Sequence, residues 1–130
     1  MRMFRLAVLS LLGIVCFIHR ASAAPPFSAW SAPENLGPIV NSAFDDSGGA
    51  LSKKGLSLYF TSTRPGGFGG EDLWVSQRRS TDESFGPPVN LGALINTAEA
   101  DRNPSLSRDG HWLFFASRLN SDFVWRLGQT

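Results

Sequence analysis

The sequence predicts an all-β fold in which a signal peptide precedes repeated units of four short antiparallel strands. Three observations carry this prediction. The first is an apolar amino-terminal segment that ends in small residues, and the second is an internal match between two parts of the remaining chain. The third is a composition with 13 glycines and 8 prolines, in which no segment keeps a helical period. Short strands joined by turns fit this composition, whereas long helices do not.

Residues 1–23 have the features of a secretory signal peptide. Two arginines precede an apolar run from Leu6 to Ile18, and Ala21-Ser22-Ala23 supplies the small residues that a signal peptidase recognises. The run has about 13 residues, whereas a membrane span needs roughly 20. We therefore expect cleavage after Ala23 or Ala24, a periplasmic or secreted protein, and no membrane span after cleavage. An uncleaved membrane anchor is the alternative.

Removal of the signal peptide changes the charge of the chain. The whole chain has 12 basic and 11 acidic residues, and loss of Arg2, Arg5 and Arg20 leaves an excess of acidic residues. This balance argues against a nucleic acid or an anionic membrane as the partner. The single cysteine, Cys16, leaves with the signal, so the mature chain, residues 24–130, has no disulfide and no cysteine for catalysis or metal binding.

A shift of 55 residues aligns the chain with itself without a gap. Residues 30–62 lie over residues 85–117, and 13 of these 33 pairs are identical. Examples are Asn35/Asn90, Leu36/Leu91, Asn41/Asn96, Asp46/Asp101 and Phe60/Phe115. A period near 50 residues is typical of propellers and solenoids, whose units cannot bury their apolar faces alone. We therefore expect two β-propeller blades, at about residues 30–84 and 85–130.

The same strands are expected in each unit, in the same order. A first strand is followed by a glycine turn, a second strand, a glycine-rich loop and a third strand, and a short outer strand lies near the start of each repeat. The third strand of the second unit is in question, because NSDFVWRLGQT lacks the glycines and the Asp-Leu-Trp of the first unit. The predicted strands are Gly49–Ser52, Leu56–Ser62, Asp72–Gln77, Pro104–Ser107 and His111–Ser117, with outer strands at Glu34–Leu36 and Val89–Leu91.

The motif of these units resembles a known repeat. DSGGALSKKGLSLYFTSTRPGGFGGEDLW in the first unit and DRNPSLSRDGHWLFFASR in the second are similar to the WD-like β-propeller repeat of TolB-type periplasmic proteins. The resemblance covers Trp30 to Arg118 and implies blades of a six-bladed propeller. Such propellers serve as binding scaffolds, envelope proteins and lids on hydrolases, so the resemblance specifies fold more than function.

Two blades are fewer than a closed propeller needs, since propellers typically have four to eight. We therefore expect a truncated reading frame, a piece of a larger propeller, or a protomer that self-associates through its open blade faces. Truncation is favoured because the sequence stops in the middle of the second blade.

Five residues are candidates for binding: Asp46, Asp101, Arg64, Arg118 and Phe68. Asp46 and Asp101 precede the first strands, near Asp45 and Glu99, where carboxylates would bind Ca²⁺ or cap the turns that enter each blade. No run has the spacing of a Ca²⁺ loop, so we predict no metal site.

Arg64 and Arg118 follow the second strands. They would bind an anionic ligand at the propeller mouth, or Arg64 would pair with Asp72 across the hairpin. Phe68, on a glycine-rich loop, would contact a partner.

No catalytic site and no cofactor are predicted. His111 is the single histidine of the mature chain, and the sequence has no Gly-x-Ser-x-Gly elbow and no phosphate-binding loop. The aromatic residues expected to pack between blades are Trp74, Trp112, Tyr59, Phe60, Phe114 and Phe115. We predict a non-enzymatic module of the periplasm or cell envelope that binds a protein or an envelope polymer. The alternatives are the propeller part of a secreted hydrolase or sugar-acting enzyme, and a non-functional remnant.

Overall fold

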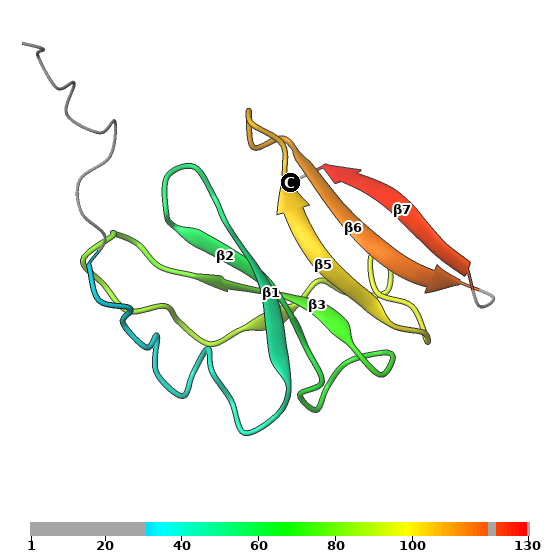
Figure 1. The fold of residues 1–130 in the computed structure, drawn as a ribbon, viewed down its shortest axis with the longest axis horizontal. Coiled ribbons are helices and arrows are strands. Elements are labelled where there is room, and N and C mark those ends of the chain that lie inside the picture. The colour runs from blue at the N-terminus through cyan, green and yellow to red at the C-terminus, as the bar shows by residue number, and fades with distance from the viewer. Residues whose placement is uncertain (1–30, 120–121, 130) are drawn as a thin grey trace, which may run out of the picture. The chain divides into compact units, whose positions relative to one another are not determined.

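The computed structural model describes residues 31–119 and 122–129, which form seven strands and no helix (Figure 1). The all-β prediction is therefore confirmed for this part of the chain. The predicted signal peptide and Trp30 lie outside the described residues. The strands are β1 Asp46–Leu51, β2 Ser57–Ser62, β3 Asp72–Gln77, β4 Val89–Asn90, β5 Asp101–Leu106, β6 Trp112–Leu119 and β7 Asp122–Gln129.

The first sheet contains β1, β2, β3 and β4 in that order, and all its neighbours are antiparallel. The turn between β1 and β2 lies where the sequence predicts it. Gly55 N donates to Ser52 O over 2.8 Å, and Gly55 has a φ of 72°, which glycine adopts without steric cost. β2 and β3 pair along their whole lengths, with Phe60 opposite Trp74. This fully paired hairpin lies at the centre of the sheet.

The second sheet contains β5, β6 and β7, and it uses the register of the first. Asp101 lies opposite Ser117 as Asp46 lies opposite Ser62, and both first strands have an irregularity in their middle. Gly48 and Asn103, which are 55 positions apart, have positive φ values of 59° and 57° in these irregularities. Asparagine is the side chain that best tolerates this conformation. β7 occupies the segment in which the sequence left the third strand in question.

The two first strands are present with bounds that differ from the prediction, and one predicted outer strand is absent. The first strands begin at Asp46 and Asp101, earlier than predicted, because both aspartates already pair with the second strands. Glu34–Leu36 is not a strand, whereas β4, at the equivalent position, pairs with β3. The physical reason is the availability of a partner, since within the described residues no third strand precedes Glu34–Leu36 in the chain.

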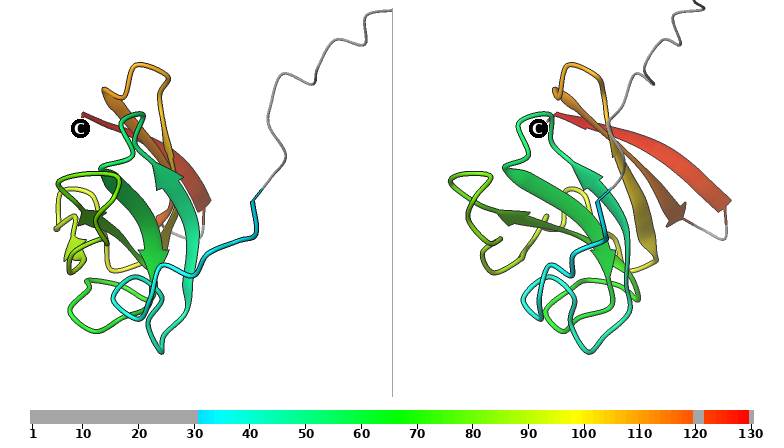
Figure 2. Two further views of the ribbon diagram at one scale, coloured as in Figure 1. Left: turned by 90° about the vertical axis from the view of Figure 1, so that its left-hand side faces the viewer. Right: turned by 60° about the vertical axis from the view of Figure 1, so that its left-hand side comes forward.

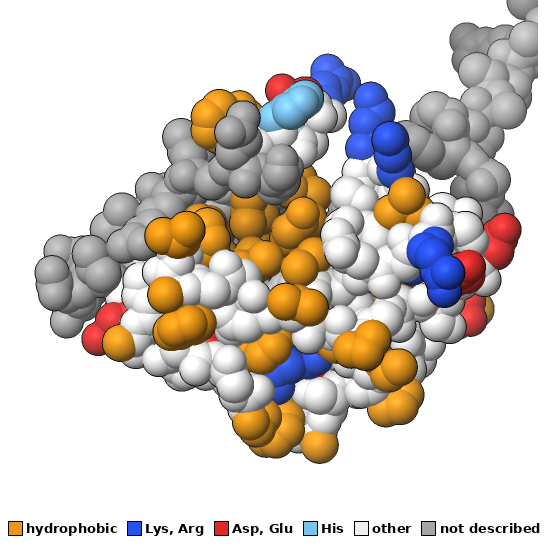
Figure 3. All heavy atoms as spheres, turned by 180° about the vertical axis from the view of Figure 1, so that it is seen from behind, with side chains coloured by type: hydrophobic (Ala, Val, Ile, Leu, Met, Phe, Trp, Pro, Cys, Tyr) orange, Lys and Arg blue, Asp and Glu red, His pale blue; other side chains and the backbone are white. Residues whose placement is uncertain are grey.

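The apolar core lies between the two sheets. Leu73, Leu113 and Phe115 form its buried centre. The half-buried residues packed against this centre are Tyr59, Leu91, Ile95 and Leu106. β5 lies beside β1 and β2 (Figure 2). On the face shown in Figure 3, other apolar side chains gather at the surface, and charged side chains lie mainly above and beside them.

Hydrogen bonds donated by backbone N–H groups of β5 also join the two sheets. Asp101 N donates to Glu71 O over 2.8 Å, and Asn103 N donates to Thr61 Oγ1 over 3.1 Å. These bonds fix the start of β5 against the first sheet, so the loops at this end of the strands are held close together.

Candidate functional site

Asp46 and Arg64 form a largely buried ion pair, in which each side chain is 11% exposed. Arg64 Nη2 donates to Asp46 Oδ1 over 2.8 Å and to Val40 O over 2.8 Å, and the guanidinium lies over the Phe60 ring. The other carboxylate oxygen of Asp46 accepts from Ser42 N and Ser42 Oγ. Both charged groups therefore hold the segment that leads into β1.

The hydrogen bonds around Asp46 determine its ionisation. Burial of the carboxylate favours the neutral acid, but hydrogen bonds from Ser62, Arg64 and Ser42 outweigh this effect and lower the pKa of Asp46 to about 2. Asp46 is therefore charged at any physiological pH, and its charge is already neutralised by Arg64.

The predicted pairing of Arg64 with Asp72 is wrong. Asp72 is buried and accepts from Phe68 N over 2.8 Å and from Gly69 N over 3.3 Å. A Cβ atom at Gly67 would overlap the Asp72 carboxylate, so glycine at this position makes room for it. Asp72 therefore fixes the loop of residues 65–70. No residue pattern around Asp72 indicated that backbone N–H groups would compete with Arg64 for this carboxylate.

Asp101 caps its turn as Asp46 does, but no arginine among the described side chains pairs with it. Its Oδ2 accepts from Thr97 N over 2.5 Å and from Thr97 Oγ1 over 2.9 Å. Its Oδ1 and the Ser117 hydroxyl are buried with no hydrogen-bond partner among the described residues. The residue 55 positions after Arg64 is Leu119. Arg64 Nε also donates to Ser62 Oγ over 2.8 Å, and Ser62 corresponds to Ser117. The second copy therefore repeats the acceptors Asp46 and Ser62 but not their arginine donor.

A groove lies at the ends of the strands where the two sheets meet; we call it the strand-end groove. Its volume is about 530 Å³. It is lined by Asp45, Thr63, Gly70, Glu71, Ala98, Glu99, Ala100, Arg102 and Arg118. Backbone hydrogen bonds from Thr63 N to Asp45 O and from Arg118 N to Ala100 O hold its walls. The groove therefore combines residues from both sheets on a hydrogen-bonded frame.

The charges of this groove are mixed, and three of them have no ion-pair partner. Arg102 pairs with Glu71 across the two sheets. Among the described residues, the side chains of Asp45, Glu99 and Arg118 form no ion pair. These three groups are therefore the ones that a ligand would neutralise.

The loop of residues 65–70 lies next to this groove. A Cβ atom at Gly69 would overlap the carbonyl oxygen of Glu99, so the loop contacts the groove wall directly. The Phe68 side chain on this loop is 52% exposed. The structure thus places Arg118 in the groove and Phe68 beside it, whereas Asp46, Asp101 and Arg64 do not line it.

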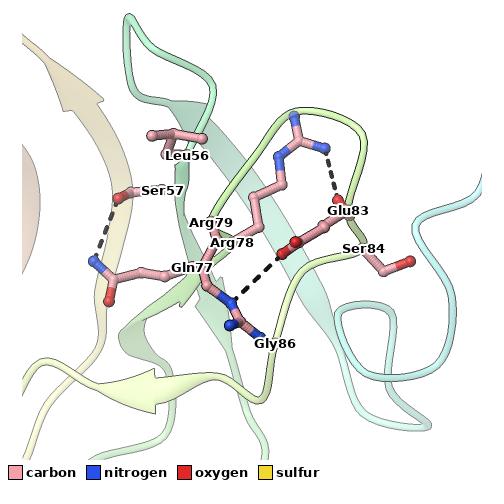
Figure 4. A pocket seen from close by; sticks show the side chains of 8 residues that line it. All are labelled: Leu56, Ser57, Gln77, Arg78, Arg79, Glu83, Ser84 and Gly86. Carbon is pink, nitrogen blue, oxygen red and sulfur yellow. Dashed lines mark hydrogen bonds and ion pairs between the residues drawn. The ribbon is translucent and has the colours of Figure 1, made fainter.

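A second hollow, of about 560 Å³, lies at the opposite ends of β2 and β3 (Figure 4). In Figure 4, Glu83 lies between the guanidinium groups of Arg78 and Arg79. Arg78 Nε donates to Gly55 O over 2.7 Å, and its guanidinium lies over the Phe85 ring. Arg78 is therefore occupied in holding the loop, which makes this hollow a weaker candidate than the strand-end groove.

Ser107, Asp109 and His111 lie close together in the turn before β6. The Ser107 hydroxyl donates to Asp109 Oδ1 and accepts from Trp112 N, while His111 Nδ1 lies 3.5 Å from Asp109 Oδ2. The serine thus bonds the aspartate and not the histidine, which is the pattern of a capped turn.

Two kinds of feature are absent from the described residues. No group of three or more histidine, cysteine, aspartate or glutamate side chains there could hold a metal ion. The described part of the chain also contains no helix with the length and apolar character needed to cross a bilayer.

Comparison with known proteins finds no family model, no curated protein and no solved structure that matches this chain. The resemblance to TolB-type repeats therefore stays a prediction from the sequence motifs.

Proposed function

We propose that this chain is an exported, non-enzymatic binding module of the periplasm or cell envelope, built from blades of a TolB-type β-propeller. The proposed site is the strand-end groove, and its partner is a protein. The observation that carries this proposal is a groove held by backbone hydrogen bonds, in which Asp45, Glu99 and Arg118 form no ion pair with any described side chain.

A polypeptide suits this groove better than a nucleic acid does. Three carboxylates and two guanidinium groups line it, so a polyanion would meet net repulsion. A peptide segment that carries both charge signs would pair its acidic group with Arg118 and its basic groups with Asp45 and Glu99. Phe68, exposed on the neighbouring loop, would supply an apolar anchor. An envelope polymer with both charge signs would satisfy the same groups.

The test is site-specific photo-cross-linking in cells that produce the full chain. A photoreactive phenylalanine analogue replaces Phe68 or Glu99, and the control carries it at Arg79, which is exposed at the second hollow. We expect one discrete cross-linked partner from positions 68 and 99 and none from position 79. Equal cross-linking from all three positions, or none from any folded variant, would contradict the proposal.

The location of the protein is tested separately. Mass spectrometry of the protein recovered from envelope or secreted fractions should show an amino terminus at Ala24 or Pro25. A cytosolic protein with an intact Met1 would contradict the export part of the proposal.

A further inference from the structure

Asn96 joins the second copy of the repeat to the first sheet. Its side-chain Oδ1 accepts from Leu73 N over 2.8 Å, and its Nδ2 donates to Leu73 O over 3.0 Å. Leu91 N donates to the same carbonyl oxygen over 3.1 Å. The Asn96 side chain is therefore paired with the backbone of β3 as a neighbouring strand would be, and it is 2% exposed.

Asn41, the equivalent residue of the first copy, makes the same bond to an asparagine of its own copy, but its side chain is exposed. Asn41 Nδ2 donates to Asn35 Oδ1 over 2.9 Å, as Asn96 Nδ2 donates to Asn90 Oδ1 over 2.8 Å. Asn41 is nevertheless exposed, and within the described residues no backbone group pairs with its Oδ1. Asn41 is therefore placed as Asn96 is, but no described strand pairs with it as β3 pairs with Asn96.

An apolar groove lies beside Asn41; we call it the docking groove. It has a volume of about 240 Å³, and its apolar lining consists of Leu36, Val40, Leu58 and Phe60. The residues 55 positions later are Leu91, Ile95, Leu113 and Phe115, all of which belong to the core that contains Leu73. Leu36 is 45% exposed. The docking groove is therefore lined by the equivalents of the second-copy residues that pack around Leu73. No described side chain occupies the position in this groove that corresponds to Leu73.

We propose that the docking groove binds β7 of a second copy of this chain. In the second sheet β7 holds the position that β3 holds in the first, since Trp125 lies opposite Ala116 as Leu73 lies opposite Thr61. Within the described residues β7 pairs only with β6, which leaves one backbone edge open. An open edge readily pairs with a strand from another chain. Each chain therefore carries both halves of one interface.

The internal contact between the two sheets specifies the register of this interface. β4 pairs Asn90 with Trp74 and Val89 with Val75. The corresponding pairs between two copies are Asn35 with Arg126 and Glu34 with Leu127 of the second molecule. Glu34 and Asn35 would then form the outer strand that they do not form in the single chain. Such a head-to-tail contact closes into a ring or continues as an open chain, depending on the rotation between subunits.

This inference goes beyond the proposed binding function and does not rest on it, because it concerns a different surface. It is tested first by the concentration dependence of mass, measured by light scattering on the purified protein in the form that the cell produces. We expect assemblies of two or more copies, and about tenfold weaker association for Asn41→Ala, which removes hydrogen bonds to the partner backbone. Leu94→Ala is the control, because Leu94 is 94% exposed and lies outside the docking groove.

Disulfide trapping tests the register. In a Cys16→Ser background, Glu34→Cys combined with Leu127→Cys should give an intermolecular disulfide on mild oxidation, and Glu34→Cys combined with Asp122→Cys should not. A monomer at every concentration, an assembly that Asn41→Ala leaves unchanged, or equal trapping by both cysteine pairs would overturn the proposal. Occupation of the groove by any other segment or protein would overturn it as well. Loss of cross-linking at Phe68 and Glu99 would instead contradict the proposed function alone.

Discussion

Arg64 Nη2 lies 2.8 Å from Asp46 Oδ1, and this ion pair connects the loop after β2 to the start of β1. The pair is charge-assisted and largely buried, so it contributes more to stability than an exposed pair does. Its acceptors recur 55 positions later at Asp101 and Ser117, but its arginine does not. The two sheets should therefore differ in how they respond to substitution at the arginine position.

Asp46 should make the stability of the protein depend on pH in the acid range. Because its pKa is about 2 in the folded state and 3.8 ordinarily, the folded state binds a proton less readily than the unfolded chain does. The stabilisation is complete above about pH 4 and is lost as the pH falls toward 2, and it amounts to about 2 kcal/mol.

Urea unfolding measured between pH 7 and pH 2.5 checks this expectation. The difference in unfolding free energy between the protein and its Asp46→Asn variant should shrink over the acid range. A difference that stays constant with pH would show that Asp46 does not carry the effect.

Substitution at the arginine position should have opposite effects in the two repeats. Arg64→Leu leaves the Asp46 carboxylate without its partner and should cost about 3 kcal/mol. Leu119→Arg supplies the missing donor for Asp101 and Ser117 and should stabilise the protein by about 1 kcal/mol. Chemical unfolding of both variants measures these changes, with Leu119→Met as the control for size without charge. Destabilisation by Leu119→Arg would mean that an arginine at position 119 does not satisfy the buried acceptors.

Two glycines of the loop before β3 should differ sharply in their tolerance of alanine. A Cβ atom at Gly69 would overlap backbone atoms of Glu99 and Thr97, whereas a Cβ atom at Gly70 would meet nothing within 4 Å. Gly69→Ala should therefore destabilise the protein by about 2 kcal/mol, in the range of overpacking substitutions, and Gly70→Ala should be close to neutral. Thermal melting of the two variants checks this, and equal melting temperatures would contradict the contact between this loop and the groove wall.

The sequence predicted those features that depend on local pattern. The strands predicted at Leu56–Ser62 and Asp72–Gln77 correspond to β2 and β3, and Gly55 identified the turn before β2. Phe68 was expected to be exposed because it lies among glycines, and it is. These features need only the neighbouring residues, so a single sequence is sufficient to find them.

Features that depend on contacts between distant segments could not be predicted in the same way. Arg64 was expected to pair with Asp72, which is near in sequence, but the pairing of β1 with β2 places Asp46 opposite Ser62 and within reach of Arg64. The pairing of Arg102 with Glu71 joins the two sheets, and the repeat motifs that contain these residues do not indicate that they meet. Whether Glu34–Leu36 forms a strand depends on a partner strand and not on its own residues. The strand-end groove follows from such contacts and was therefore found only in the structure.

The two equivalent asparagines should differ in their effect on the stability of a single chain. Asn96→Ala leaves the Leu73 N–H buried without an acceptor and removes one of the two donors to the Leu73 carbonyl. It should cost about 2–3 kcal/mol, because an unsatisfied buried N–H loses the hydration that it has in the unfolded chain. Asn41→Ala removes an exposed side chain that bonds only Asn35 among the described residues, and in the monomer it should cost about 0.5 kcal/mol.

Urea unfolding at low protein concentration, where association is weakest, separates the two effects. The asymmetry follows from the neighbour that each asparagine has, since Asn96 meets β3 of its own chain and Asn41 meets no strand in the described part of the chain. At high concentration Asn41→Ala should become destabilising relative to the unchanged protein, because assembly stabilises the folded state by mass action. Equal costs for the two substitutions at low concentration would show that the backbone of Leu73 does not depend on Asn96, and the analogy that assigns a strand to Asn41 would lose its basis.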